Sequence, residues 1–235
     1  QWVWSRYLAL SYYSKPPMIA YLQYLGTSLF GDTELGVRFF SPLIAAAMAL
    51  LILRFVAREV NARTGFAAVL IVSTAPLLAV GSTLMTIDPP LVLFWTAAMF
   101  LGWRAMEAAD TAPSAGGGIC QNPTALWCLA GFFLGLSFLS KYAALYQVVC
   151  WVLFFILWKP ARVHLRTPGP WLALLILGLC TLPVIIWNAQ NGWITVHHVA
   201  DNAGRTEPWK PTLRYFWDFV GSQTALLNPV FFAGM

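Results

Sequence analysis

The feature that most constrains this chain is a series of long stretches that contain no charged residue. They lie at 39–53, 64–87, 89–103, 111–140, 142–158, 167–196 and 219–235. Only 10% of the 235 residues are charged, against about 25% in ordinary soluble domains. Because a membrane-spanning helix needs roughly 20 mainly apolar residues, this pattern predicts an all-α polytopic membrane protein. About seven spans are expected, near 36–57, 65–85, 89–106, 125–140, 142–158, 170–187 and 216–235.

The domain organisation is expected to be simple. No internal repeat or low-complexity region is present, so residues 1–235 are interpreted as one partial transmembrane domain. Residues 107–124 are rich in Gly, Pro and Ser and are expected to form a loop. Lys141 interrupts an apolar region, so residues 125–158 form either two spans or one long broken helix. The chain starts at QWVWS and stops inside an apolar run, and we expect a fragment cut at both ends.

The distribution of positive charge orients the spans. Each side of the membrane receives seven Lys or Arg residues, but they are denser in the short loops 58–64, 107–124 and 159–169. Because short cytoplasmic loops are enriched in Lys and Arg, we expect those loops to be cytoplasmic. Residues 1–34, expected to form amphipathic juxtamembrane helices, and the loop 188–215 are then external. The cations on the external side need a further explanation.

The tyrosines gather on the same expected external side. All eight lie in the external loops or within about one turn of them: Tyr7, Tyr12, Tyr13, Tyr21, Tyr24, Tyr142, Tyr146 and Tyr215. One interpretation is an aromatic belt at the lipid headgroups, but such a belt occupies both interfaces. The alternative is a surface that faces a ligand, because aromatic faces suit sugar rings and amphipathic groups. Tyr12 and Tyr13 are the candidates for that surface.

Lys15 stands at the start of an expected interface helix. Pro16 and Pro17 suit the first turn of a helix, and an apolar face follows at helical spacing, made of Met18, Leu22, Leu25 and Leu29. A cation near the positive end of the helix dipole is unfavourable unless an anion lies between them. Since helix N-termini bind phosphate, Lys15 is either a phosphate ligand or a lysine that extends to lipid headgroups.

Two further charged residues lie at the edges of apolar runs. Asp88 precedes Pro89 and Pro90, where an acid can cap a helix and still offer an oxygen to a ligand or a metal. Lys141 is embedded between two runs, which makes it a candidate functional residue. The net charge of +5 has no polybasic run, so the chain is not expected to bind nucleic acid.

Three motifs carry a resemblance to a known family. SYYSKPPMIAYLQYLGTSLFGDTELGVRFFSPL, TLMTIDPPLVLFW and GLSFLSKYAAL resemble the bacterial branch of the protein-mannosyltransferase superfamily, which includes the aminoarabinose transferases of lipid A. The resemblance covers nearly the whole chain, and its first block is the most specific. It implies a GT-C-type helix bundle in the bacterial inner membrane and chemistry on its periplasmic face.

The resemblance also implies partners and roles. The donor would be a polyprenyl-phosphate-linked sugar, and the acceptor a hydroxyl of a lipid, glycan or protein. Lys15 matches the lysine that contacts the lipid phosphate, Lys141 a lysine of the donor cavity, and Arg205 an arginine of an external loop. Asp88 matches a secondary acidic position. The principal Asp-Glu pair of the family would lie upstream of Gln1, so the fragment is expected to lack that pair.

The implied reaction is glycosyl transfer with loss of polyprenyl phosphate. Lys15 and Arg205 would stabilise the negative charge on the leaving phosphate, and Asp88 would position the sugar, the acceptor or a possible divalent cation. No other cofactor is implied. The rival hypothesis is a transporter or flippase for a lipid-linked or anionic substrate. Transporters commonly show repeats and midplane charges, whereas the charges here gather at one interface.

Overall fold

The computed structural model describes residues 1–110, 122–202 and 213–227. These residues form α-helices and short 3-10 helices, with no β-strand among them, which confirms the expected all-α class. The elements in chain order are α1 Trp2–Ser5, α2 Met18–Phe30, α3 Glu34–Arg38, α4 Phe40–Glu59, α5 Ala62–Thr74, α6 Pro76–Gly81, α7 Asp88–Asp110, α8 Pro123–Ser140, η2 Tyr142–Ala144, α9 Leu145–Leu157, η3 Lys159–Arg166, α10 Pro168–Gln190, α11 Ile194–Asn202 and α12 Arg214–Leu227.

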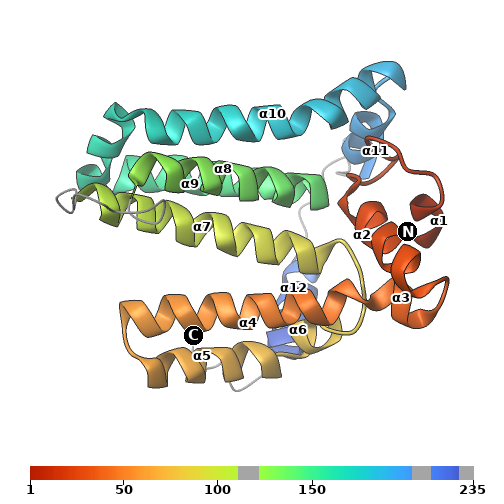
Figure 1. Cartoon of the computed structure of the whole chain (residues 1–235), viewed down its shortest axis with the longest axis horizontal. Coiled ribbons are helices and arrows are strands. Elements are labelled where there is room, and N and C mark those ends of the chain that lie inside the picture. Colours follow the sequence, from red (N-terminus) through yellow and green to blue (C-terminus); the bar gives the residue numbers. More distant parts are fainter. Residues whose placement is uncertain (111–121, 203–212, 228–235) are drawn as a thin grey trace.

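The long helices lie side by side in a bundle (Figure 1). The most extensive packing is that of α8 against α7 and α10, and α4 packs against α5 and α7. Many large apolar side chains on the outer faces of α4, α5, α9 and α10 are exposed. An apolar exterior of this extent is what a lipid environment requires.

The structure allows the expected spans to be compared with the helices. Among the described residues, three helical segments are long and apolar enough to cross a membrane: Glu34–Glu59, Pro123–Ser140 and Pro168–Gln190. A fourth is possible if η2 and α9 form one broken span with η3, which bends away by 114°. α7 has 23 residues but carries charge in its last turns. The expected number of about seven spans stays a prediction.

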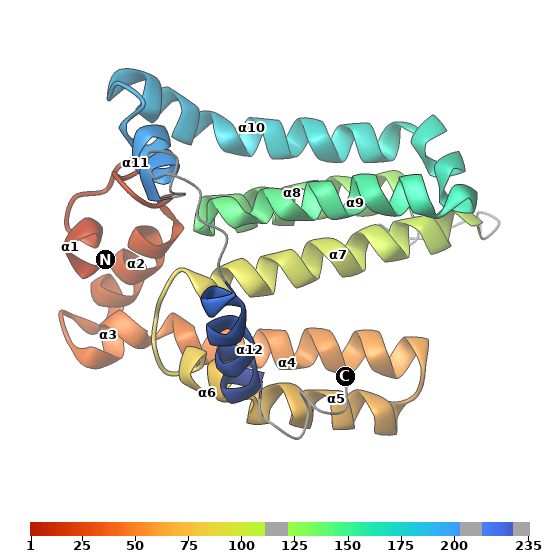
Figure 2. The ribbon, with the colours of Figure 1, turned by 180° about the vertical axis from the view of Figure 1, so that it is seen from behind.

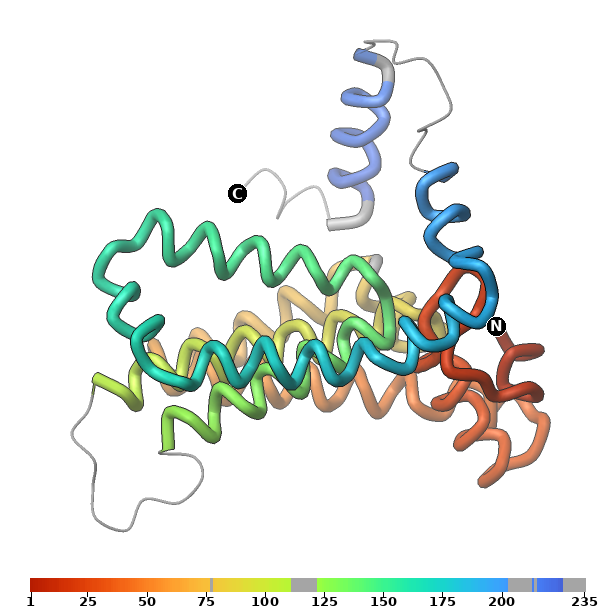
Figure 3. Tube along the Cα trace, turned by 90° about the horizontal axis from the view of Figure 1, so that it is seen from above, coloured from red at the N-terminus to blue at the C-terminus, as the bar shows by residue number. Residues whose placement is uncertain are grey.

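Two expected spans differ from what the structure shows. The segment 65–85 is not one helix, because Ala75 is extended and Pro76 starts the separate helix α6, as the restriction on residues before proline explains. The segment 216–235 begins with α12, which has only 14 residues and runs crosswise to the long helices (Figures 2 and 3). Residues 228–235 lie outside the described residues.

The turn at Lys141 separates two helices. α8 ends at Ser140, Lys141 has an extended backbone, and the chain continues through η2 into α9. α9 runs back along the bundle in the direction opposite to α8 (Figure 3). Of the two alternatives for residues 125–158, the structure therefore shows two helices and not one long broken helix.

The interface segment packs against one end of the bundle. α1, α2 and α3 lie together at that end (Figure 1), where Ile19 of α2 joins a buried cluster with Ile44, Met85 and Ile87. α2 and α3 cross closely at two glycines. A Cβ on Gly26 would collide with the carbonyl of Gly36, and a Cβ on Gly36 would collide with the carbonyl of Gly31. Leu25 and Leu29, on the expected apolar face of α2, remain exposed, as they would be if that face met lipid.

Candidate functional site

One end of the bundle collects the residues singled out from the sequence. The loop between α1 and α2 carries Tyr12, Tyr13 and Lys15, α7 starts with Asp88, and Lys141 lies in the turn after α8. α11 lies beside the α1–α2 loop at the same end (Figures 1 and 3). Arg205, the remaining candidate, lies outside the described residues.

Asp88 and Lys141 form an ion pair. The Lys141 ammonium donates a hydrogen bond of 2.8 Å to a carboxylate oxygen of Asp88. The two side chains keep 56% and 37% of their surface exposed, so the pair is accessible to a ligand. The backbone N–H of Asp88 donates to the Thr86 hydroxyl at 3.4 Å. The sequence did not predict this pairing, because 53 residues separate the partners.

The Tyr12 side chain is buried, and its hydroxyl forms hydrogen bonds within the N-terminal segment. Its side chain is 7% exposed, and its ring stacks on Trp4 with 5.0 Å between centroids. The hydroxyl donates to the carbonyl oxygens of Trp4 and Tyr7 and accepts from the N–H of Ala9. Burial raises the pKa of the Tyr12 phenol, and the Ala9 hydrogen bond partly opposes this, so the hydroxyl stays protonated. Contact of Tyr12 with substrate stays a prediction, and the burial of its hydroxyl favours an indirect role.

The Tyr12 hydroxyl should therefore matter for stability more than for binding. Tyr12→Phe in the complete protein is expected to lower the free energy of unfolding by about 1–3 kcal/mol, because carbonyl groups that it satisfies lose their partner. Thermal unfolding in detergent measures this change. Affinity for the donor lipid should stay within about twofold. Unchanged stability together with a large loss of donor affinity would show that Tyr12 contacts the ligand directly.

Tyr13 and α11 come together over the α1–α2 loop. Tyr13 is exposed, and its ring lies against His198 with 4.5 Å between centroids. The Thr195 hydroxyl donates to the carbonyl of Tyr12 at 3.2 Å and is buried. α11, which leads into the segment that carries Arg205, is thereby fixed to the loop that carries Lys15.

Tyr142 is a site residue that the sequence did not single out. Its hydroxyl lies 3.2 Å from the hydroxyl of Ser11, and Ser11 is fully buried. This contact connects the turn that holds Lys141 with the loop that holds Lys15. The only sequence signal was the clustering of tyrosines on one side, which did not distinguish Tyr142 from the others.

Lys15 is half-buried and has no ion-pair partner among the described residues. Its carbonyl accepts the N–H of Tyr12 at 3.1 Å, and the two prolines that follow it are fully buried. α2 begins at Met18, and no side chain caps its N-terminus. The backbone of Lys15 therefore lies just before the N-terminus of α2, where the positive end of the helix dipole favours an anion.

The described residues offer little to a metal ion. No group of three or more His, Cys, Asp or Glu side chains comes together in the described ranges. The carboxylate of Asp88 is already paired with Lys141. A divalent cation at this end would therefore take most of its ligands from a bound phosphate or from water.

Comparison with solved structures identifies the fold. The chain superimposes on a crystal structure of ArnT from Cupriavidus metallidurans in the apo state with a TM-score of 0.65. The match covers 93% of this chain and 38% of that one, at 17% sequence identity. The fold is thus the GT-C-type membrane fold, as the sequence led us to expect. The sequence itself identifies the family: residues 14–187 match the dolichyl-phosphate-mannose-protein mannosyltransferase family, and the chain belongs to it.

Curated relatives are named glycosyltransferases. The lipid A galacturonosyltransferase RgtD of Rhizobium johnstonii is 30% identical over 239 residues, which is all of this chain and 46% of that protein. The undecaprenyl phosphate-alpha-4-amino-4-deoxy-L-arabinose arabinosyl transferase of Edwardsiella ictaluri is 32% identical over 191 residues, 81% of this chain and 33% of that protein. The chain spans less than half the length of these two relatives.

Proposed function

We propose that the protein is a membrane glycosyltransferase that moves a sugar from a polyprenyl-phosphate carrier to an acceptor hydroxyl. The observation that carries this proposal is Lys15, which has no ion-pair partner among the described residues and directly precedes the uncapped start of α2, at the same end of the bundle as the Asp88–Lys141 pair. Family membership gives the reaction type. The names of the relatives favour an undecaprenyl-phosphate donor and a lipid acceptor such as lipid A.

The charged residues suggest how the site would bind the donor and stabilise its leaving phosphate. Cleavage of the bond between sugar and phosphate leaves negative charge on the polyprenyl phosphate, and a fixed ammonium is a good electrostatic partner for that charge. Lys15 supplies this ammonium, and Arg205 adds a second cation from the external loop. Asp88, held by Lys141 at 2.8 Å, presents its remaining lone pairs to sugar or acceptor hydroxyls.

A transfer assay separates the proposed enzyme from a transporter. The full-length protein, reconstituted with undecaprenyl-phosphate-linked aminoarabinose or galacturonic acid and lipid A, should release free undecaprenyl phosphate and form sugar-modified lipid A. Mass spectrometry detects both products. A transporter or flippase would change the leaflet of the donor and leave its sugar–phosphate bond intact. That outcome with both sugars would overturn the proposal.

We also propose that the protein lies in the bacterial inner membrane with this site facing the periplasm. The support is the dense positive charge of residues 159–169. The Lys and Arg residues of this segment all lie in η3, at the opposite end of the bundle from α2 (Figure 1). Short loops rich in Lys and Arg remain in the cytoplasm.

Single cysteines placed in the two ends test this orientation. A membrane-impermeant thiol reagent applied to intact spheroplasts should label Val163→Cys in η3 only after permeabilisation. It should label Val196→Cys in α11 without it. Both side chains are exposed, so access to reagent depends on the side of the membrane. The reverse labelling pattern would show that the orientation is wrong.

A further inference from the structure

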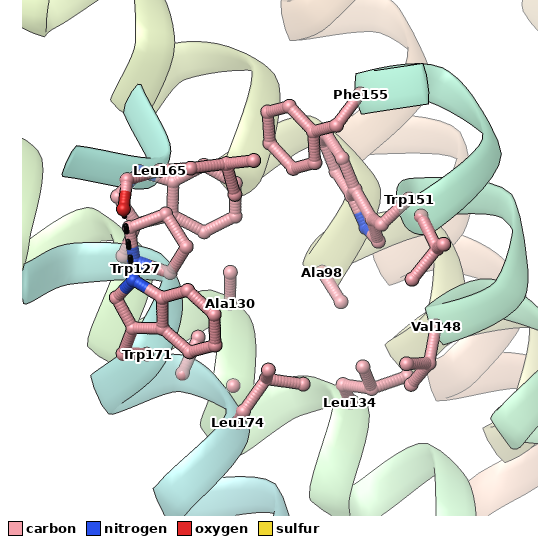
Figure 4. Close-up of a pocket in the computed structure, with 14 residues that line it drawn as sticks. Ala98, Trp127, Ala130, Leu134, Val148, Trp151, Phe155, Leu165, Trp171 and Leu174 are labelled. Carbon is pink, nitrogen blue, oxygen red and sulfur yellow. Dashed lines mark hydrogen bonds between the residues drawn. The ribbon is translucent and has the colours of Figure 1, made fainter. Parts of the chain in front are cut away.

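The bundle contains an apolar pocket far along the helices from the site described above. It lies between α8, α9 and α10, with η3 at one end, and has a volume of about 270 Å³ (Figure 4). Its lining includes Ala98, Leu134, Val148, Trp151 and Leu174. The volume is close to the lower limit of about 300 Å³ for small-molecule sites. Its lining is almost wholly apolar, so the occupant must be a hydrocarbon group.

The pocket extends along α8 from the end near η3. Trp127 lies in the first turns of α8, and Leu134 lies seven residues further along, about 10 Å deeper at 1.5 Å per residue. Trp171, in the first turn of α10, donates from its indole nitrogen to the Leu165 carbonyl at 2.9 Å (Figure 4). Tryptophan is enriched at membrane interfaces, which supports an entrance at headgroup depth.

The pocket is open to the surroundings of the bundle. Three of its lining residues keep a large exposed fraction, with 52% for Val152, 59% for Trp171 and 44% for Leu174. These residues come from α9 and α10, so the opening lies between those two helices. In a membrane this opening faces lipid chains and not water.

η3, which borders one end of the pocket, is rich in cations. η3 has the sequence KPARVHLR, and Leu165 in it lines the pocket. Arg162 donates to the carbonyls of Phe155 and Ile156 at the end of α9, at 2.9 and 2.6 Å. Lys159 and Arg166 are exposed and have no ion-pair partner in the described part of the chain.

One acid faces this cluster. The carboxylate of Asp110 lies 3.8 Å from His164 of η3. The cations Lys159, Arg162 and Arg166 therefore outnumber the acid that pairs with η3 among the described residues. Basic pockets between helices on the cytoplasmic side of a membrane are typical sites for anionic lipid headgroups.

We propose that this pocket binds one acyl chain of an anionic phospholipid, with the headgroup held by Lys159 and Arg166. The site is separate from the proposed donor site, because it lies by η3 and not by α2. Bound lipid would fill the space between α9 and the α8–α10 pair and would fix η3 against the bundle. A polar occupant is excluded, because the lining offers almost no hydrogen-bonding group to it.

Photolabelling of the full-length protein tests the proposal. The protein is reconstituted in phosphatidylcholine vesicles that contain a small fraction of phosphatidylglycerol with a diazirine near the end of one acyl chain. Adducts should concentrate on peptides that contain Leu134, Val148 and Leu174, and equimolar labelled phosphatidylcholine should give several-fold fewer. Equal labelling by both lipids, or labels spread evenly over α4, α5 and α10, would overturn the proposal.

Matched variants distinguish the pocket from the general lipid surface. Leu174→Trp should fill the pocket and reduce the adducts several-fold, whereas Leu175→Trp, at an exposed neighbour outside the lining, should not. Lys159→Gln and Arg166→Gln should each lower phosphatidylglycerol labelling about fivefold. Arg63→Gln, in the first turn of α5 at the same end of the bundle, should leave it unchanged. Equal effects of each variant and its control would overturn the proposal.

Two other occupants would give distinct results. If a protein segment beyond this chain covers the pocket, its peptides would crosslink there and no lipid adduct would form. If the polyprenyl tail of the donor fills it, unlabelled undecaprenyl phosphate would compete with the phosphatidylglycerol label. Either result would overturn the phospholipid assignment, and competition by undecaprenyl phosphate would leave the proposed transferase function standing.

Discussion

Asp88→Asn in the complete protein is expected to lower the rate of sugar transfer on the order of 10²-fold, the usual effect of losing an electrostatic or acid–base group. The substitution keeps the shape of the side chain, and asparagine is as good as aspartate at a helix start, so α7 should still begin at the same place. What it removes is the negative charge 2.8 Å from the Lys141 ammonium. Initial rates with saturating donor and acceptor measure the change.

Two controls separate chemistry from the ion pair itself. A partly exposed ion pair contributes at most about 1 kcal/mol to stability, so Asp88→Asn should change thermal unfolding little. The charge-swapped variant with Asp88→Lys and Lys141→Asp rebuilds the pair in reverse. If the pair only joins α7 to the α8–η2 turn, the swap should restore activity. Restored activity, or full activity of Asp88→Asn, would contradict a role for the carboxylate in transfer.

Lys15→Ala is expected to weaken binding of the polyprenyl-phosphate sugar by roughly 1.5–3 kcal/mol, the usual contribution of a hydrogen bond to a charged group. This corresponds to about a 10- to 150-fold higher Kd. Folding should be unaffected, because the Lys15 side chain has no ion-pair partner among the described residues. Donor titration of purified wild type and variant in the same detergent measures the difference.

Arg6→Gln is the matched control for Lys15. Arg6 is the first residue after α1 and pairs with Asp32 at 2.9 Å, so its substitution changes the local charge and leaves Lys15 in place. Donor affinity should stay close to that of wild type. Lys15→Arg should recover part of the affinity, since the guanidinium keeps the charge but not the compact shape of the ammonium. Equal losses in Lys15→Ala and Arg6→Gln would indicate a general charge effect and no phosphate contact.

The sequence predicted the local features of the site. The prolines after Asp88 lie in the first turn of α7, as predicted. Pro16 and Pro17 were expected in the first turn of the interface helix, but α2 begins at Met18, directly after them. These signals are local, because proline restricts the backbone of its own and the preceding residue. Pro76 likewise indicates a helix break within the expected span 65–85. The long apolar run around it favoured one continuous helix instead.

The contacts between distant segments could not be predicted in the same way. The Asp88–Lys141 pair and the Ser11–Tyr142 contact join residues 53 and 131 positions apart, and only the packing of α7, α8 and the α1–α2 loop brings them together. The burial of Tyr12 is of the same kind. An aromatic residue near a membrane surface can contact a ligand or can pack inside the protein. Which of these roles it has depends on its neighbours in the folded structure.

The central claim is that the end of the bundle formed by α2, the start of α7 and the Lys141 turn holds a lipid-linked sugar phosphate. A photoreactive undecaprenyl-phosphate sugar, with the reactive group next to the phosphate, tests it directly on the reconstituted full-length protein. Adducts are expected on the peptides that contain residues 11–18, 86–90 and 140–143, with strong reduction in Lys15→Ala. Adducts confined to other parts of the protein, or unchanged labelling in that variant, would contradict the claim.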